Sequence, residues 1–112
     1  GDVVYKKLNT SAWKYYKYDA DGTDKLILPS GIVTEAITAT ADGIILIGGI
    51  MRDETWALSP SADTAVTIYA SVTAGGLSLT APGTTGDEIV VVGLMVGGNT
   101  IQTTFGYTWV EK

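Results

Sequence analysis

The stretch YASVTAGGLSLTAPGTTGDEIVVVGLMV, residues 69–96, decides the fold class of this chain of 112 residues. Its second half contains Ile89 followed by three valines, the most β-prone run in the sequence. Gly93 interrupts this run before the apolar residues resume. A continuous apolar strand of this kind is expected to be buried on both faces, so the rest of the chain must cover it.

Short strands separated by glycine-rich turns are expected along the whole chain. Apolar or alternating runs predict strands at residues 2–7, 13–18, 31–40, 44–51, 64–71, 88–96, 100–105 and 107–110, with a shorter one at 77–80. Turn signals occupy residues 8–12, 19–24, 41–43, 75–76, 82–86 and 97–99. A spacing of roughly ten residues between about eight or nine strands predicts one all-β domain over residues 1–112, a β-sandwich or a small barrel.

Three short runs of the sequence give more detailed predictions of packing and of strand ends. In residues 13–18 the alternation predicts that Trp13 and Tyr15 pack inward, while Lys14 and Lys17 lie in water. The run IILIGGIM, residues 44–51, predicts a second buried strand with a glycine bulge. Pro29 is expected to stop a short apolar run at residues 25–28.

The composition predicts a domain that assembles with copies of itself. Apolar residues make up 46% of the chain and charged residues 17%, below the typical fraction of about 25%. A small domain with so few charges has apolar surface left over, and oligomerisation covers such surface.

The net charge of −5 argues against binding to nucleic acid or to anionic lipid. No apolar run approaches the ~20 residues of a membrane span, and no signal peptide is visible. Because the chain begins at Gly1 rather than at a methionine, we expect a processed or cleaved start or a piece of something longer.

Several kinds of chemistry are not supported by the residue types present. The chain has no cysteine and no histidine, which excludes disulfides and thiolate metal sites and removes the commonest general base. Its serines have no histidine partner and no elbow motif. We therefore expect no enzyme activity and no cofactor.

Two charged clusters are candidate sites. Asp19, Asp21 and Asp24 surround a glycine, and three carboxylates so close together are able to hold Ca²⁺. Their spacing does not match an EF-hand loop, so a solvated turn is the favoured interpretation and the metal site stays open. Asp53 and Glu54 are adjacent, so on a strand they point to opposite faces and do not form a catalytic pair. An exposed turn or an ion pair between subunits is favoured there.

The candidate contact residues are aromatic residues and one arginine. Trp13, Tyr15, Tyr16 and Tyr18 form the one aromatic cluster, which is typical either of a sugar-binding face or of a core and subunit interface. The second interpretation is favoured. Arg52 is the only arginine and is a reasonable interface anchor, with Trp56 beside it as a further candidate contact.

A family resemblance adds a function to this pattern. The segments TAGGLSLTAP, residues 73–82, and GDEIVVVG, residues 86–93, resemble a module of bacteriophage virion proteins, namely head-fibre, capsid-decoration and tail-fibre-like proteins. Further matching features lie from residue 44 to residue 101, and residues 1–37 match more weakly. The resemblance covers roughly two-thirds of the chain. It is a pattern of strands and turns rather than a catalytic signature, and this chain has no collagen-like or coiled-coil stalk.

The resemblance implies a non-enzymatic all-β domain, usually a trimer, on the outside of a virion. We therefore expect a homotrimer that decorates or cements a capsid at local threefold positions, or that forms the knob of a head fibre, with the major capsid protein or other virion proteins as partners. The alternative is a tail-fibre tip that binds a host receptor or glycan through the aromatic cluster. The sequence leaves open which of these positions applies, what the host is, and which residues contact the partner.

Overall fold

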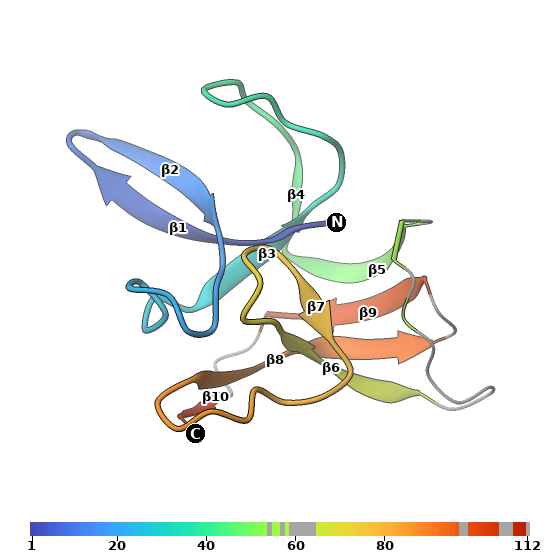
Figure 1. Ribbon diagram of the computed structural model, residues 1–112. Coiled ribbons are helices and arrows are strands. Elements are labelled where there is room, and N and C mark those ends of the chain that lie inside the picture. Colours follow the sequence, from blue (N-terminus) through green and yellow to red (C-terminus); the bar gives the residue numbers. More distant parts are fainter. Residues whose placement is uncertain (54, 57, 59–64, 97–98, 106–108, 112) are drawn as a thin grey trace.

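The computed structural model describes residues 1–53, 55, 56, 58, 65–96, 99–105 and 109–111 (Figure 1). These residues form ten strands and no helix, and the predicted all-β fold is confirmed with one or two strands more than expected. No candidate membrane-spanning helix occurs in this part of the chain.

The first sheet is antiparallel, with the strand order β2-β1-β3-β4. Its strands are β1 (Val3–Asn9), β2 (Ala12–Lys17), β3 (Pro29–Val33) and β4 (Ile45–Leu46). The first two form a hairpin in which Asn9 lies opposite Ala12, so two residues make the turn. Pro29 begins β3, where a strand tolerates a residue without an N–H donor, whereas the sequence predicted that it would stop a run.

The second sheet is also antiparallel, with the order β5-β9-β8-β6-β7 and with β10 paired to β8. Its strands are β5 (Gly48–Arg52), β6 (Val66–Ala70), β7 (Leu77–Ser78), β8 (Glu88–Val96), β9 (Thr100–Thr104) and β10 (Trp109–Glu111). The bounds predicted for β8 are confirmed. The turn predicted at residues 97–99 falls between β8 and β9 in the sequence, and residues 97 and 98 lie outside the described residues.

A β-bulge changes which side chains of β8 face the core. Two adjacent residues of β6 pair with Gly93 and Val91, so Val92 is an extra residue in β8. Val92 and Met95 are consequently both fully buried although they are three residues apart, while Leu94 is 43% exposed. The expectation that β8 is buried on both faces is wrong, because only its inward face packs against the first sheet.

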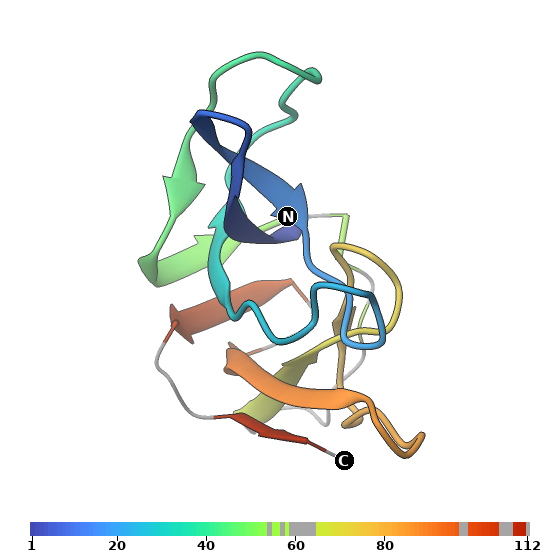
Figure 2. The ribbon, with the colours of Figure 1, turned by 90° about the vertical axis from the view of Figure 1, so that its left-hand side faces the viewer.

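One hydrophobic cluster joins the two sheets, which lie as two layers in Figure 2. Backbone hydrogen bonds also link them: the N–H of Val3 donates to the carbonyl of Gly75 over 2.9 Å, and the N–H of Glu88 donates to the carbonyl of Ala20 over 2.9 Å. The result is a small β-sandwich. The cluster consists of Val3, Tyr5, Tyr18, Ala20 and Ile32 on one side and Ile68, Ala70, Val90, Val92, Met95 and Ile101 on the other.

The largest departure from the predicted strands lies between β3 and β4. Residues 31–40 were expected to form one strand, but β3 ends at Val33 and residues 34–44 form an extended loop, which we call the arm. Its turn is closed by the N–H of Ala41, which donates to the carbonyl of Thr38 over 3.0 Å, and Thr40 has a φ of 68°. The arm and the β1–β2 hairpin both project away from the second sheet (Figure 1).

Candidate functional site

The outward face of the β1–β2 hairpin carries exposed apolar side chains. Lys6 lies opposite Tyr15 and Leu8 lies opposite Trp13, and residues paired in this way share a face. Trp13 is 63% exposed and Tyr15 is 45% exposed, so the prediction that these two rings pack inward is wrong. The physical reason is that no described element covers this face. We call the set the hairpin face: Lys6, Leu8, Trp13, Tyr15 and Lys17.

The inward face of the same hairpin belongs to the core. The rings of Tyr5 and Tyr16 lie 5.7 Å apart, and the rings of Tyr5 and Tyr18 meet edge to face at 6.3 Å. Tyr18 is 1% exposed, and its hydroxyl donates a 2.8 Å hydrogen bond to the carbonyl of Lys25. Burial, and then the nearby charge of Glu88, raise the pKa of Tyr18 above its usual range. The four predicted contact aromatics are thus divided between two faces, and only Trp13 and Tyr15 are exposed.

Two lysines border the exposed rings of the hairpin face. The Nζ atom of Lys6 lies 5.3 Å from the ring centroid of Trp13, which is cation–π geometry. Lys17 forms an ion pair of 3.1 Å with Asp2, and both side chains stay largely exposed. The hairpin face therefore combines flat apolar surface with positive charge.

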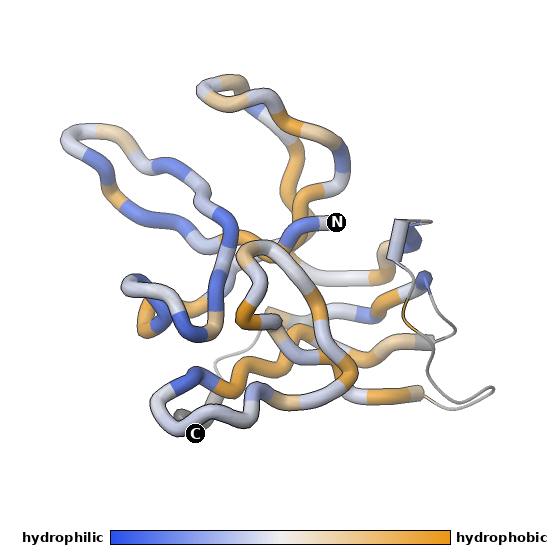
Figure 3. The backbone as a smooth tube through the Cα atoms, in the orientation of Figure 1, coloured by the Kyte–Doolittle hydropathy of each residue, from blue (hydrophilic) through white to orange (hydrophobic). Residues whose placement is uncertain are grey.

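A second exposed apolar surface lies where the chain passes from the first sheet to the second. Ile44, Ile47 and Ile50 are 65%, 71% and 72% exposed, so the buried strand predicted at residues 44–51 is wrong. Two short strands replace it, β4 and β5, and each is the edge of its sheet. Gly49 has a φ of 118°, a geometry that glycine tolerates. The glycine bulge predicted here is wrong, because β5 pairs with β9 in regular register from Gly48 to Arg52. We call these three residues the isoleucine edge; Figure 3 shows the chain as hydrophobic along β4, at the start of this edge.

The predicted contacts after β5 have different surroundings. Arg52 is exposed at the end of β5, whereas Trp56 is half-buried and packs against the core. Asp53 accepts hydrogen bonds from the N–H and the hydroxyl of Thr55 and pairs with the Gly1 amino group at 3.2 Å. The bonds from Thr55 lower the pKa of Asp53, so this carboxyl is held charged. Glu54 lies outside the described residues.

The acidic turn at residues 19–24 is a turn, as predicted, and its carboxylates have separate partners. Asp24 accepts a 2.8 Å bond from the Nζ of Lys7 and a 2.9 Å bond from the hydroxyl of Tyr5. These two bonds lower the pKa of Asp24. Burial, and then the bond to Asp24, raise the pKa of Tyr5 to about 12.

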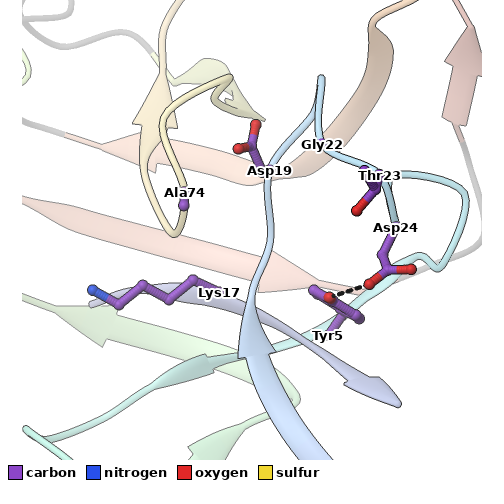
Figure 4. A pocket seen from close by; sticks show the side chains of 7 residues that line it. All are labelled: Tyr5, Lys17, Asp19, Gly22, Thr23, Asp24 and Ala74. Atoms are coloured by element: carbon purple, nitrogen blue, oxygen red, sulfur yellow. Dashed lines mark hydrogen bonds between the residues drawn. The ribbon is translucent and has the colours of Figure 1, made fainter.

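A shallow pocket of about 180 Å³ lies beside this turn (Figure 4). The carboxylates of Asp19 and Asp24 point in different directions within it. Asp19 accepts a 3.3 Å bond from the N–H of Asp21, and burial is the main cause that raises the pKa of Asp19. The described residues contain no group of three acidic, histidine or cysteine side chains that could hold a metal ion. The pocket is lined by Tyr5, Lys17, Asp19, Gly22, Thr23, Asp24 and Ala74.

The outer face of the second sheet has a hollow of about 200 Å³. Val91, Gly93 and Leu94 of β8 and Gln102 of β9 line it. Ile50, Gln102 and Leu94 lie in one row across three strands, so the hollow adjoins the isoleucine edge. The sequence did not indicate this hollow, whose lining residues Val91 and Gly93 flank the bulge at Val92.

Sequence reasoning missed Leu8 and the three residues of the isoleucine edge as surface candidates. A signal for Leu8 was present, because a two-residue turn after Asn9 fixes the register that places Leu8 beside Trp13. No local signal identified the isoleucine edge, since an uncharged run is also typical of a buried strand.

Comparison of the chain with protein-family models, with curated protein sequences and with solved structures finds no match. The resemblance to phage virion modules therefore stays a prediction.

Proposed function

We propose that this protein is a structural component of a bacteriophage virion surface, without enzyme activity, which assembles with copies of itself into a homotrimer. The observation that carries this proposal is the exposure of large apolar side chains on the hairpin face and the isoleucine edge. Monomeric proteins expose single apolar residues, but grouped ones mark interaction sites. The virion assignment rests on the resemblance of residues 73–82 and 86–93.

The proposed mechanism is assembly by burial. Edge strands with exposed apolar residues and no charge at the edge are prone to pair with other chains. In β5 the only charged residue is Arg52, at its end. Contacts with neighbouring copies and with the capsid protein beneath would remove the isoleucine edge from water, and each Å² of apolar surface so buried contributes roughly 25 cal/mol. Shape-matched contacts among several subunits would then hold the shell together.

The first experiment is the mass of the protein in solution, measured by light scattering at micromolar concentration. We expect three times the chain mass of 11.7 kDa. The variant Ile50→Lys places a charge in the isoleucine edge and should lower the mass, while the matched variant Val72→Lys, at a separate site that is 44% exposed, should not. A monomeric wild type at these concentrations would contradict the proposal. Imaging of the intact particle then tests the virion location.

A second candidate function is glycan binding at a tail-fibre tip. The specific observation in its favour is that Trp13 and Tyr15 are exposed side by side on one face of a projecting hairpin. Flat apolar rings with polar groups around them suit the apolar face of a sugar. Saturable binding to a host polysaccharide that is lost in Trp13→Ala and kept in Tyr16→Phe would favour this function, because Tyr16 lies on the other face.

A further inference from the structure

The β1–β2 hairpin and the body of the protein carry opposite charge. Residues 3–17 contain Lys6, Lys7, Lys14 and Lys17 and no acidic residue, a formal charge of +4. Since the whole chain carries −5, the remaining residues carry −9. Four of the seven basic residues are thus concentrated in one projecting element.

The arm has the opposite character. Residues 34–44 contain Glu35 and Asp42 and no basic residue, and both acidic residues are exposed. The arm ends at Ile44, which is 65% exposed, and Ile47 follows at 71%. Apolar side chains and negative charge therefore occur together on the arm, as apolar side chains and positive charge do on the hairpin face.

We infer that the hairpin face of one copy docks against the arm of a second copy of this chain. This inference rests on the proposed self-assembly and names the surfaces that perform it. Of the four lysines, only Lys6 and Lys17 lie on the hairpin face, and Lys17 is paired with Asp2. Lys7 and Lys14 lie on the opposite face of the hairpin. Charge complementarity selects the second copy as the occupant, because the hairpin face has no acidic residue of its own and the arm has no basic one. Burial of Trp13 and Leu8 against Ile44 supplies the apolar part of the contact.

This contact is of the kind that closes a ring. The two surfaces are different, so the contact is heterologous, and each copy offers both a hairpin face and an arm. Heterologous contacts form a closed ring when repeating the rotation from one copy to the next returns to the first copy. A ring of three copies agrees with the proposed trimer. The hairpin and the arm project in the same general direction, so both are available to neighbouring copies (Figure 1).

Charge reversal tests the pairing directly. Lys6→Glu should raise the dissociation constant of the assembly at least about tenfold, and so should Glu35→Lys combined with Asp42→Lys, because each places like charges in the contact. The triple variant that combines all three substitutions restores opposite charges and should recover most of the affinity. Asp21→Lys, which changes an exposed acidic residue outside both surfaces, is the control and should leave the dissociation constant unchanged. Thermal unfolding of each variant checks that the exposed substitutions leave the fold intact.

The outcomes separate this inference from the self-assembly on which it rests. A higher dissociation constant in both charge-reversed variants, with affinity recovered in the triple variant, supports the docking. An assembly whose mass is unchanged by every reversal overturns the docking but leaves self-assembly standing, whereas a monomeric wild type overturns both. Binding of polygalacturonate that Lys6→Glu abolishes while the assembly mass stays constant also overturns the docking and assigns the hairpin face to an anionic glycan.

Discussion

The hydroxyl of Thr103 donates a 2.6 Å hydrogen bond to the carbonyl oxygen of Val92 inside the core. Val92 is the extra residue of the bulge in β8, and Thr103 lies on the neighbouring strand β9. Both side chains are fully buried. The bond therefore joins β8 to β9 at the residue where the bulge interrupts the pairing of β8 with β6.

Replacing this hydroxyl should destabilise the fold. In Thr103→Val the side chain keeps its shape but no longer donates to Val92, which leaves a buried carbonyl oxygen without that donor. We expect a loss of about 1–3 kcal/mol in the free energy of unfolding, measured by urea denaturation. Thr103→Ser keeps the hydroxyl and loses one methyl group, so it should cost about 1 kcal/mol. A valine variant as stable as the wild type would show that the bond contributes nothing.

Gly93 should not tolerate a side chain. A Cβ atom there would lie 2.2 Å from the backbone oxygen of Gln102, and backbone atoms cannot move aside as a flexible side chain can. Gly93→Ala should therefore lower the free energy of unfolding by about 1–3 kcal/mol. Gly83→Ala is the matched control, because a Cβ atom at this position has no neighbour within 4 Å. Equal midpoints of thermal unfolding in the two variants would contradict the close approach of β8 and β9.

The raised pKa of Tyr5 predicts a loss of stability in alkali. A phenol whose pKa in the folded state, about 12, lies above its ordinary value of 10.0 stabilises the fold below pH 10. This contribution disappears as the pH rises from 10 to about 12. Tyr5→Phe should be less stable than the wild type at neutral pH and should lose less on going through this range. Tyr15→Phe, which removes an exposed hydroxyl, should lose stability with rising pH as the wild type does. The free energy of unfolding, measured against pH by urea denaturation, checks this. Parallel curves for all three proteins would contradict the stabilising role of the Tyr5 hydroxyl.

The lowered pKa of Asp24 predicts a loss of stability in acid. Its carboxylate is held charged by Lys7 and Tyr5, so its contribution is complete above the ordinary pKa of 3.8. The contribution is lost as the pH falls below this value. Asp24→Asn should have a lower midpoint of thermal unfolding at pH 7 and a shallower decline toward acid. Asp42→Asn, on the exposed arm, is the control when all variants are compared in the monomeric state. A curve for Asp24→Asn that coincides with the wild type at every pH would refute the role of Asp24.

The division of the hairpin into two faces predicts unequal effects of truncation. Trp13→Ala removes a ring that is 63% exposed and should change the free energy of unfolding by no more than about 0.5 kcal/mol. Tyr18→Ala removes a ring that is 1% exposed and should cost about 3–5 kcal/mol. Chemical denaturation measures both, at protein concentrations low enough for the assembly to dissociate into monomers. A large loss from Trp13→Ala alone would mean that the hairpin face is covered within the chain.

The sequence by itself determined the fold class and several elements of this protein. The β-branched run at residues 88–96 became β8, and the alternating run at residues 64–71 became β6. The glycine turn at residues 75–76 was also predicted, and Gly75 has a φ of 77° there. These features are local, since β-propensity, a period of two and positive φ act within a few residues.

Only the tertiary structure decided which faces are covered. Alternation divided the hairpin into two faces, but it could not tell which one meets the second sheet, and Tyr18 rather than Trp13 proved to be buried. Likewise, an uncharged run of isoleucines fits a central strand or an edge, and Ile50 lies at an edge. Whether a face is buried depends on the element that packs against it, and that element is distant in sequence. A local pattern therefore predicts the strand but not which of its faces is buried.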